Sequence, residues 1–208
     1  MTPASSSQIP ILVCEIANSH AGDDVHMDKL IDTITAIEYP RKAIKFQVFT
    51  AETLSLPDFS WFDVYRKLSF CRDQWRYFIE KASRDCDVWI DIFDLYGVEV
   101  LEENLDRVSG LKLQASVLEN QEVLDGLSRL PLADKIMTIN VSGHGLDDIG
   151  RFLGIFREIS SRLALQIGFQ AYPTAIEDTA LQKIGILRAA FPDYAIVMAD
   201  HSPGDEDF

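Results

Sequence analysis

The sequence predicts an α/β fold, a (β/α)8 TIM barrel that stops after its seventh strand. Three observations lead to this prediction. Apolar strand-like runs alternate with amphipathic helical runs along the chain, which is typical of parallel sheets whose strands are connected by helices. The strand-like runs carry polar residues on one face. No glycine-rich turn follows the first run, although a dinucleotide-binding open sheet needs one there.

Seven segments have the length and composition of buried strands. They are Ile11–Ala17, Ala43–Phe49, Asp87–Phe93, Leu111–Ser116, Ile136–Ser142, Leu163–Gln170 and Tyr194–His201. Side chains alternate between faces along a strand. In the second segment, Ile44, Phe46 and Val48 therefore share one face, and Lys45 and Gln47 share the other. A buried lysine is costly unless it meets an anion, so this segment indicates an anion-binding face.

Four segments between the strands repeat apolar residues at the spacing of one buried helix face. The repeats are Met27, Leu30, Ile31, Ile34 and Ile37; Trp75, Phe78, Ile79 and Ala82; Ile149, Phe152, Leu153, Phe156 and Ile159; and Leu181, Ile184, Leu187 and Ala190. Capping residues indicate three helix starts, at Ser69, Asn120 and Asp178.

The polar face distinguishes a barrel from an open sheet. An open sheet covered by helices on both sides has strands that are apolar on both faces. Here the face opposite the apolar one collects Glu15, Lys45, Gln47, Asp91, Lys112, Gln114, Asn140, Gln166 and Gln170. A polar interior suits a barrel whose active site lies at the carboxyl ends of its strands.

A complete barrel of this kind takes about 250 residues, and this chain has 208. Phe208 falls where the seventh loop should lead into the seventh helix, so we expect a truncated barrel or a part of a longer protein. Residues 1–9 are expected to be a disordered or extended N-terminus. Residues 10–208 then form the barrel domain, without an internal boundary.

Composition narrows the class of protein. Hydrophobic residues make up 47% of the chain and charged residues 25%, which are ordinary globular values. The net charge of −14 argues against nucleic acid and anionic membranes as partners. There is no signal-peptide pattern and no apolar run long enough to span a membrane. With three cysteines in no metal-binding spacing, we expect a cytoplasmic protein.

Motifs at the ends of these segments resemble those of the sialic acid synthase (N-acetylneuraminate synthase) family. The motifs are Cys14-Glu15-Ile16-Ala17-Asn18-Ser19-His20-Ala21-Gly22, Lys45-Phe46-Gln47, Tyr172-Pro173-Thr174 with Glu177-Asp178, and Asp200-His201-Ser202. The family carries A-E-I-G-x-N-H-x-G, K-F-Q-T, Y-P-T-P-x-E-D and S-D-H-T in the same order. The resemblance extends from Ile11 to Glu206.

The resemblance implies condensation of phosphoenolpyruvate with the open-chain aldehyde of an amino sugar, which gives a sialic-acid-like 2-keto sugar acid and phosphate. It also implies a divalent metal, Mn²⁺ or Mg²⁺. Phosphoenolpyruvate carries two acidic groups, which need cations and donors in a water-poor site. Lys45 and Lys112 are expected to clamp it. Family members form homodimers through a second, antifreeze-like domain, which we do not find in these 208 residues, so a homodimer stays open.

The candidate site residues fall into three groups. The catalytic candidates are Glu15, Lys45, Gln47 and Lys112; the substrate-binding candidates are Asn140, Gln170, Tyr172 and Asp91; and the metal-binding candidate is His201. The family's second metal-binding histidine belongs to an eighth strand. The same polar residues are also explained by a layer of paired side chains inside a barrel, with Glu15 forming a salt bridge to Lys45.

Several positions depart from the family pattern. Asp91 stands where a threonine usually meets the phosphate, and an anion there would repel it. The other departures are Ser19, Ala115, Val117 and Ala199. Two alternatives therefore stay open: a Kdo-phosphate or DAHP synthase, and a non-catalytic sugar-binding barrel with a degenerate active site. A Kdo-phosphate or DAHP synthase needs a larger basic set for its phosphorylated aldose.

Overall fold

The computed structural model describes residues 9–169 and 171–202. Seven parallel strands form one sheet, and their order in the sheet is their order in the chain. The strands are β1 (Leu12–Glu15), β2 (Lys42–Val48), β3 (Asp87–Ile92), β4 (Val108–Leu113), β5 (Ile136–Asn140), β6 (Arg162–Ile167) and β7 (Ala195–Met198). A doubly wound sheet reverses its strand order, so the open-sheet alternative is excluded.

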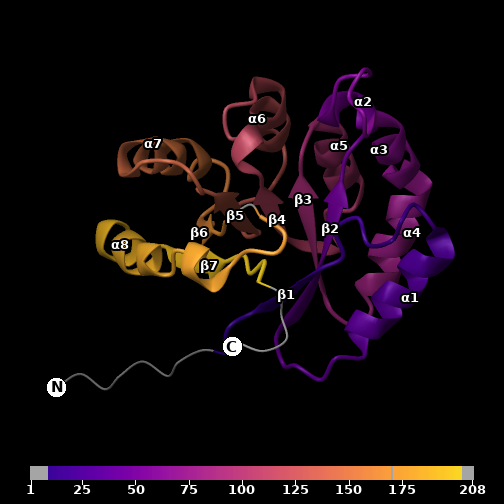
Figure 1. The fold of residues 1–208 in the computed structure, drawn as a ribbon, viewed down its shortest axis with the longest axis horizontal. Helices are drawn as coiled ribbons and strands as arrows, with labels where there is room; N and C mark the ends of the chain where they lie inside the picture. The colour runs from indigo at the N-terminus through magenta and orange to yellow at the C-terminus, as the bar shows by residue number, and fades with distance from the viewer. Residues whose placement is uncertain (1–8, 170, 203–208) are drawn as a thin grey trace.

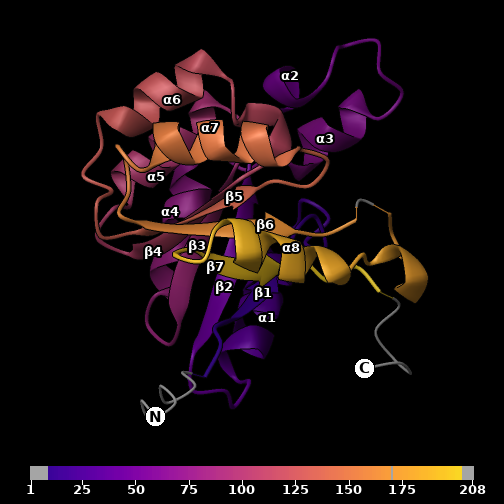
Figure 2. The same cartoon turned by 90° about the vertical axis from the view of Figure 1, so that its left-hand side faces the viewer.

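The helices surround the sheet on its outside, from α1 through α6 to α8 (Figures 1 and 2). They are α1 (Asp24–Thr35), α2 (Ala51–Leu54), α3 (Phe62–Leu68), α4 (Arg72–Ala82), α5 (Leu95–Glu103), α6 (Gln121–Ser128), α7 (Leu146–Phe156) and α8 (Gln182–Ala190), with 3₁₀ turns η1 (Ala115–Val117) and η2 (Ile176–Asp178). Within the described residues, β1 and β7 each pair with a single strand. The fold is thus a curled half-barrel, and a closed eight-stranded barrel is not seen.

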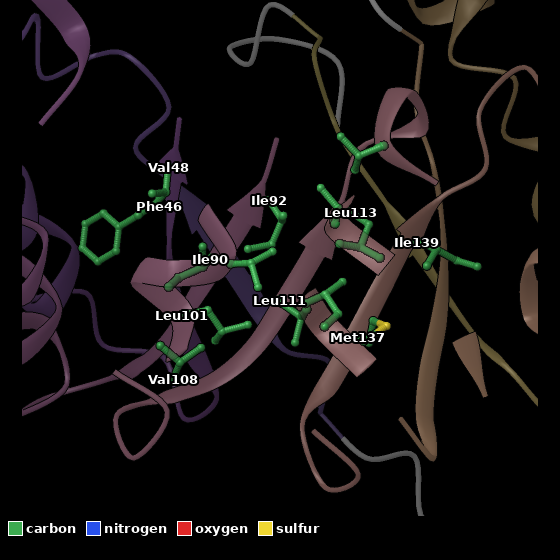
Figure 3. Close-up of a cluster of buried hydrophobic side chains, with 14 of the residues drawn as sticks. Phe46, Val48, Ile90, Ile92, Leu101, Val108, Leu111, Leu113, Met137 and Ile139 are labelled. Atoms are coloured by element: carbon green, nitrogen blue, oxygen red, sulfur yellow. The ribbon is translucent and has the colours of Figure 1, made fainter. Parts of the chain in front are cut away.

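The hydrophobic core lies between the outer face of the sheet and the helices. Figure 3 shows its central part, where side chains from neighbouring strands meet those of α5. The labelled residues are Phe46, Val48, Ile90, Ile92, Leu101, Val108, Leu111, Leu113, Met137 and Ile139, and each is at most 1% exposed. Complete burial of one such side chain stabilises a fold by about 1.5–3 kcal/mol. The predicted division into an apolar outer and a polar inner face is therefore confirmed.

The loop after β1 is built around His20. Its side chain is fully buried, its Nδ1 accepts a hydrogen bond from the Gly22 amide at 3.0 Å, and its ring contacts Phe70. Gly22 has a φ of +74°, and a Cβ there would lie 1.9 Å from the carbonyl oxygen of Lys67. Because only glycine fits this close approach without strain, the His20–Gly22 turn fixes the path from β1 to α1.

The predicted helix starts have mixed outcomes. Asn120 caps α6 as predicted, because its side chain accepts hydrogen bonds from two amides of the first turn. Ser69 instead ends α3, and α4 begins after Cys71. Asp178 lies in the turn η2, and α8 begins four residues later at Gln182. These two predictions were wrong because a polar residue before an apolar repeat also suits a turn.

The predicted strands all exist, but each of them ends earlier than expected. The first ends at Glu15 and the seventh at Met198, because the residues that follow turn into loops at the rim of the sheet. β4 instead begins three residues before its predicted start, at Val108. It includes Gly110, where a Cβ would lie 2.4 Å from the Trp89 ring. This glycine makes room for the indole inside the curled sheet.

No helix among the described residues is long and apolar enough to cross a bilayer.

Candidate active site

Strand register brings the predicted ionic residues together on the inner face of the sheet. Glu15 on β1 lies opposite Lys45 on β2. On the next pair of strands, Gln47 lies opposite Asp91, and Asp91 in turn lies opposite Lys112 on β4. Residues that are paired across parallel strands point to the same face. The polar residues therefore meet within four neighbouring strands.

Two lysines and two carboxylates form a buried cluster. Lys112 Nζ lies 2.8 Å from Asp91 Oδ2, and Lys45 Nζ lies 3.7 Å from the same oxygen. Lys45 Nζ also lies 3.1 Å from Glu15 Oε2. The side chains of both lysines are at most 7% exposed and that of Asp91 is fully buried. Buried charges are tolerated when they are paired, so the predicted Glu15–Lys45 salt bridge is confirmed as part of a larger cluster.

Burial and mutual attraction set the protonation of these groups. Burial raises the pKa of Asp91, and the two lysines offset this only in part. Burial also lowers the pKa of Lys45, against the attraction of Asp91 and Glu15. For Glu15, burial acts to raise the pKa, but Lys45 and Lys112 outweigh it and the pKa is lowered. The same carboxylates outweigh burial at Lys112 and raise its pKa. The environment therefore favours the charged forms of Glu15 and Lys112 and disfavours those of Asp91 and Lys45 relative to the free side chains.

Three amides extend the cluster along the sheet. Gln47 Nε2 donates to Glu15 Oε1 at 2.8 Å, and Gln114 Nε2 donates to Asp91 Oδ2 at 2.9 Å. Asn140 Nδ2 donates to Gln114 Oε1 at 3.4 Å. The predicted residues on β1 to β5 thus belong to one connected network. This arrangement agrees with the paired polar layer and also with a preorganised binding site, since pairing and function are compatible.

Two cavities lie along this network. The interior cavity, about 420 Å³ in volume, is lined by Glu15, Lys45, Lys112 and Trp89, by Thr138 and Gln166, and by edge residues of β1 and β7. The mouth cavity, also about 420 Å³, lies at the carboxyl ends of the strands and is lined by Gln47, Gln114, Asn140, Ser142 and Tyr172 and by aromatic residues. Glu15 bonds Lys45 on the interior side and Gln47 on the mouth side. It therefore stands at the boundary between the two cavities.

Several buried polar atoms of the interior have no hydrogen-bond partner among the described residues. They are Asp91 Oδ1, Thr138 Oγ1, Gln166 Oε1 and Trp89 Nε1. Buried polar atoms are nearly always paired in native proteins, and exceptions call for an explanation. A cluster of such atoms beside a cavity with two lysines indicates a binding site for a polar ligand.

The remaining site predictions concern the far side of the mouth. Tyr172 lines the mouth cavity, is 74% exposed, and its ring centroid lies 4.4 Å from that of His201. His201 lines the interior cavity, and its Nδ1 lies 2.6 Å from the carbonyl oxygen of Phe169. Gln170 lies outside the described residues. The loops after β6 and β7 therefore place Tyr172 at the mouth cavity and His201 at the interior cavity that the lysines also line.

The described residues do not by themselves complete a metal site. The bond to Phe169 leaves Nε2 of His201 as the ligand atom, and a carbonyl partner of this kind is common for metal-bound histidines. However, no group of three or more His, Cys, Asp or Glu residues capable of holding a metal occurs among the described residues. His201 as a metal ligand stays a prediction.

Two inner residues were missed when each residue was considered by itself. Trp89 is 4% exposed, lies opposite Lys45 on β2 and Gly110 on β4, and lines the interior cavity. Thr138 lies opposite Lys112 on β5 and is 2% exposed. Both have the strand parity of the polar residues, which was the available signal. They were overlooked because tryptophan and threonine are common in strands generally, so their presence does not by itself indicate a binding site.

Asp94, which follows β3, has a structural role. It is 4% exposed, and its Oδ1 accepts from the Gly97 amide at the start of α5. Its Oδ2 accepts from the Thr50 amide at 3.0 Å and from the Thr53 hydroxyl. Asp94 thereby holds the ends of β2 and β3 together at the mouth.

Solved structures with this fold include a sialic acid synthetase and two proteins of spore coat polysaccharide biosynthesis. N-acetylneuraminic acid (sialic acid) synthetase from Leptospira borgpetersenii, in complex with citrate, superposes with a TM-score of 0.80 at 21% identity over 94% of this chain. This chain shares the fold of that synthetase. A protein described as spore coat polysaccharide biosynthesis protein E from Chromobacterium violaceum gives 0.82 at 18% identity over 95% of the chain. The spore coat polysaccharide biosynthesis protein spsE from Bacillus subtilis gives 0.74 at 22% identity over 92%.

The likeness is one of structure. No family model matches the chain, and no curated protein matches it in sequence. The chain spans 60%, 66% and 53% of the lengths of the Chromobacterium, Leptospira and Bacillus proteins. The fold resemblance inferred from the motifs is thus confirmed over nearly the whole chain.

Proposed function

We propose that this chain carries the phosphoenolpyruvate-binding barrel of a synthase that makes a sialic-acid-like 2-keto sugar acid. The reaction joins C3 of phosphoenolpyruvate to the aldehyde carbon of an amino sugar, consumes water and releases phosphate. The observation that carries the proposal is the pair of buried ammonium groups, Lys45 and Lys112, inside the curled sheet and beside a cavity of about 420 Å³. The Leptospira synthetase of the same fold was solved with citrate, another small polyanion.

The two lysines supply the charge that phosphoenolpyruvate requires. Ammonium groups in a water-poor site bind carboxylate and phosphate oxygens more strongly than they do in water. Thr138 and Gln166 line the same cavity with unpaired oxygens. The Thr138 hydroxyl can donate to an anion, and Gln166 carries an amide for the same purpose. We therefore assign the interior cavity to phosphoenolpyruvate.

The mouth cavity suits an uncharged acceptor. Among its described lining residues are amides and hydroxyls, such as Gln47, Gln114, Asn140 and Ser116, and aromatic rings, such as Phe93, but no charged side chain. Amides bind sugar hydroxyls, whereas a phosphorylated aldose needs cations. This observation favours an amino sugar over the phosphorylated aldoses of Kdo-phosphate and DAHP synthases. Tyr172 and Asn140 are the residues that we expect to contact the sugar.

Glu15 is the proposed proton-handling group, because it stands where the two cavities meet. Its lowered pKa keeps it ionised at neutral pH, so it holds Lys45. The ionised form can accept a proton, although less readily than a carboxylate of ordinary pKa, and it cannot act as a general acid, which needs a raised pKa. Gln47 orients it through the 2.8 Å hydrogen bond.

One observation favours the second candidate, a sugar-binding barrel without catalysis. Asp91 already pairs with both lysines, so the charge available to a polyanion is reduced. In this alternative the interior cluster is structural, and the uncharged mouth cavity binds a sugar alone.

Isothermal titration calorimetry with phosphoenolpyruvate, with and without Mn²⁺, separates the two candidates. The variants are Lys45→Met, which keeps the apolar stem of the side chain, and Lys29→Ala on the exposed face of α1 as the control. We expect wild type and Lys29→Ala to bind phosphoenolpyruvate equally and folded Lys45→Met to bind at least tenfold more weakly, a loss of about 1.4 kcal/mol. Equal binding by all three proteins would rule out the assigned interior site. Binding of N-acetylmannosamine without any binding of phosphoenolpyruvate would support the sugar-binding alternative.

A further inference from the structure

Asp91 is the central residue of the interior cluster. Its side chain is fully buried, and its Oδ2 lies 2.8 Å from Lys112 Nζ and 3.7 Å from Lys45 Nζ. Gln114 Nε2 donates to the same oxygen at 2.9 Å. One carboxylate oxygen therefore contacts both ammonium groups and accepts a hydrogen bond from the Gln114 amide.

This set of donors is one that a bound anion would use. Carboxylate and phosphate oxygens accept short, charge-assisted hydrogen bonds from lysine and further bonds from neutral amides. The other oxygen of the carboxylate, Oδ1, is buried without a partner among the described residues, so Asp91 is imperfectly satisfied where it stands. Asp91 Oδ2 thus uses the ammonium and amide groups that could otherwise bind an oxygen of an anion.

The charges of the cluster cancel. Lys45 and Lys112 are the lysines that line the interior cavity within the described residues, and Glu15 and Asp91 are their paired carboxylates. Asp200 lies at the rim and adds further negative charge. A substrate with two acidic groups therefore enters a site without net positive charge and competes with a carboxylate that is already held in place.

We propose that Asp91 is a specificity-determining residue, a built-in anion that occupies the subsite of Lys45 and Lys112 and thereby weakens the binding of phosphorylated, multiply charged ligands. The inference rests on the proposed function, because it concerns the same interior cavity. It identifies Asp91 as the residue that sets how strongly this chain binds phosphoenolpyruvate.

The test compares Asp91→Asn with wild type and with Asp87→Asn by isothermal titration with phosphoenolpyruvate and, separately, with inorganic phosphate. Asparagine keeps the size and an acceptor oxygen for Lys112 but removes the charge. Asp87 is an exposed aspartate at the start of the same strand, so its substitution controls for the change in net charge. We expect Asp91→Asn to bind both ligands at least tenfold more tightly than wild type, and Asp87→Asn to match wild type.

The outcomes separate this inference from the proposed function. If wild type binds phosphoenolpyruvate and folded Asp91→Asn binds it no better, the inference is overturned and the proposed function stands. If only Asp91→Asn binds, the inference holds, and wild type does not use phosphoenolpyruvate. If neither binds, both are wrong.

A measurement on wild type covers the case in which Asp91→Asn does not fold. Thermal unfolding is followed with increasing inorganic phosphate, because a ligand that binds only the folded state raises its stability in a saturable way. With Asp91 in place, we expect no saturable increase below about 10 mM phosphate. Saturation below that concentration would show that the lysines are available despite Asp91, and would overturn the inference.

Discussion

The contact between Gly110 and Trp89 gives a prediction whose size follows from the structure. A Cβ at Gly110 would lie 2.4, 2.6 and 2.8 Å from three atoms of the indole ring. β4 is paired on both sides, with β3 and β5, so its backbone has little freedom to retreat. In Gly110→Ala the rigid indole must instead move toward the interior cavity. Overpacking of this kind costs about 1–3 kcal/mol.

Gly150→Ala is the matched control for the same chemical change. Gly150 lies in the middle of α7, and a Cβ there would meet nothing within 4 Å. Alanine is favoured over glycine in a helix by up to about 1 kcal/mol, so this variant should be more stable than wild type. One methyl group thus changes stability in opposite directions at the two sites.

Urea unfolding followed by circular dichroism measures both effects. We expect the midpoint to fall in Gly110→Ala and to rise in Gly150→Ala, with the slope of the free energy against urea unchanged. A Gly110→Ala variant as stable as wild type would refute the close packing of Trp89 against β4. It would also argue against Trp89 as a lining residue of the interior cavity.

Two further predictions concern His20 and Asn120. Burial lowers the pKa of His20 from 6.5 to about 4, so between these values the unfolded chain binds the proton more readily, and stability should fall by up to about 2 kcal/mol from pH 7 to pH 5. Urea unfolding at the two pH values should show that His20→Gln loses this pH dependence of stability, whereas substitution of the exposed His26 by Gln keeps it. An unchanged pH dependence in His20→Gln would contradict His20 as its source. Asn120→Ala removes the cap of α6 and should cost about 1 kcal/mol, against little change in Gln121→Ala; equal stability of the two variants would argue against the cap.

Strand parity made much of the fold and of the site predictable. The alternation of apolar and polar residues from Ile44 to Val48 identifies the face that must be buried against helices, since a period of two leaves no other choice. The same alternation places Lys45, Lys112 and Asp91 on the inner face. For that reason the seven strands and most of the candidate residues follow from the pattern of side chains alone.

The partners of these residues depended on register, which local sequence does not encode. Val88 lies opposite Val108, but an irregularity then shifts the pairing, so that Trp89 lies opposite Gly110 and Asp91 opposite Lys112. Without this shift Asp91 would lie beside Leu111, and the inner and outer faces of the two strands would not match.

The sequence by itself determined that the chain forms parallel strands with a polar inner face, because side-chain alternation is a local property of each strand. Only the tertiary structure decided that Asp91 pairs with both Lys45 and Lys112, because this pairing depends on the register between separate strands. It also decided that the interior and mouth cavities are separated by Glu15 and Gln47, since neither cavity exists until the sheet curls.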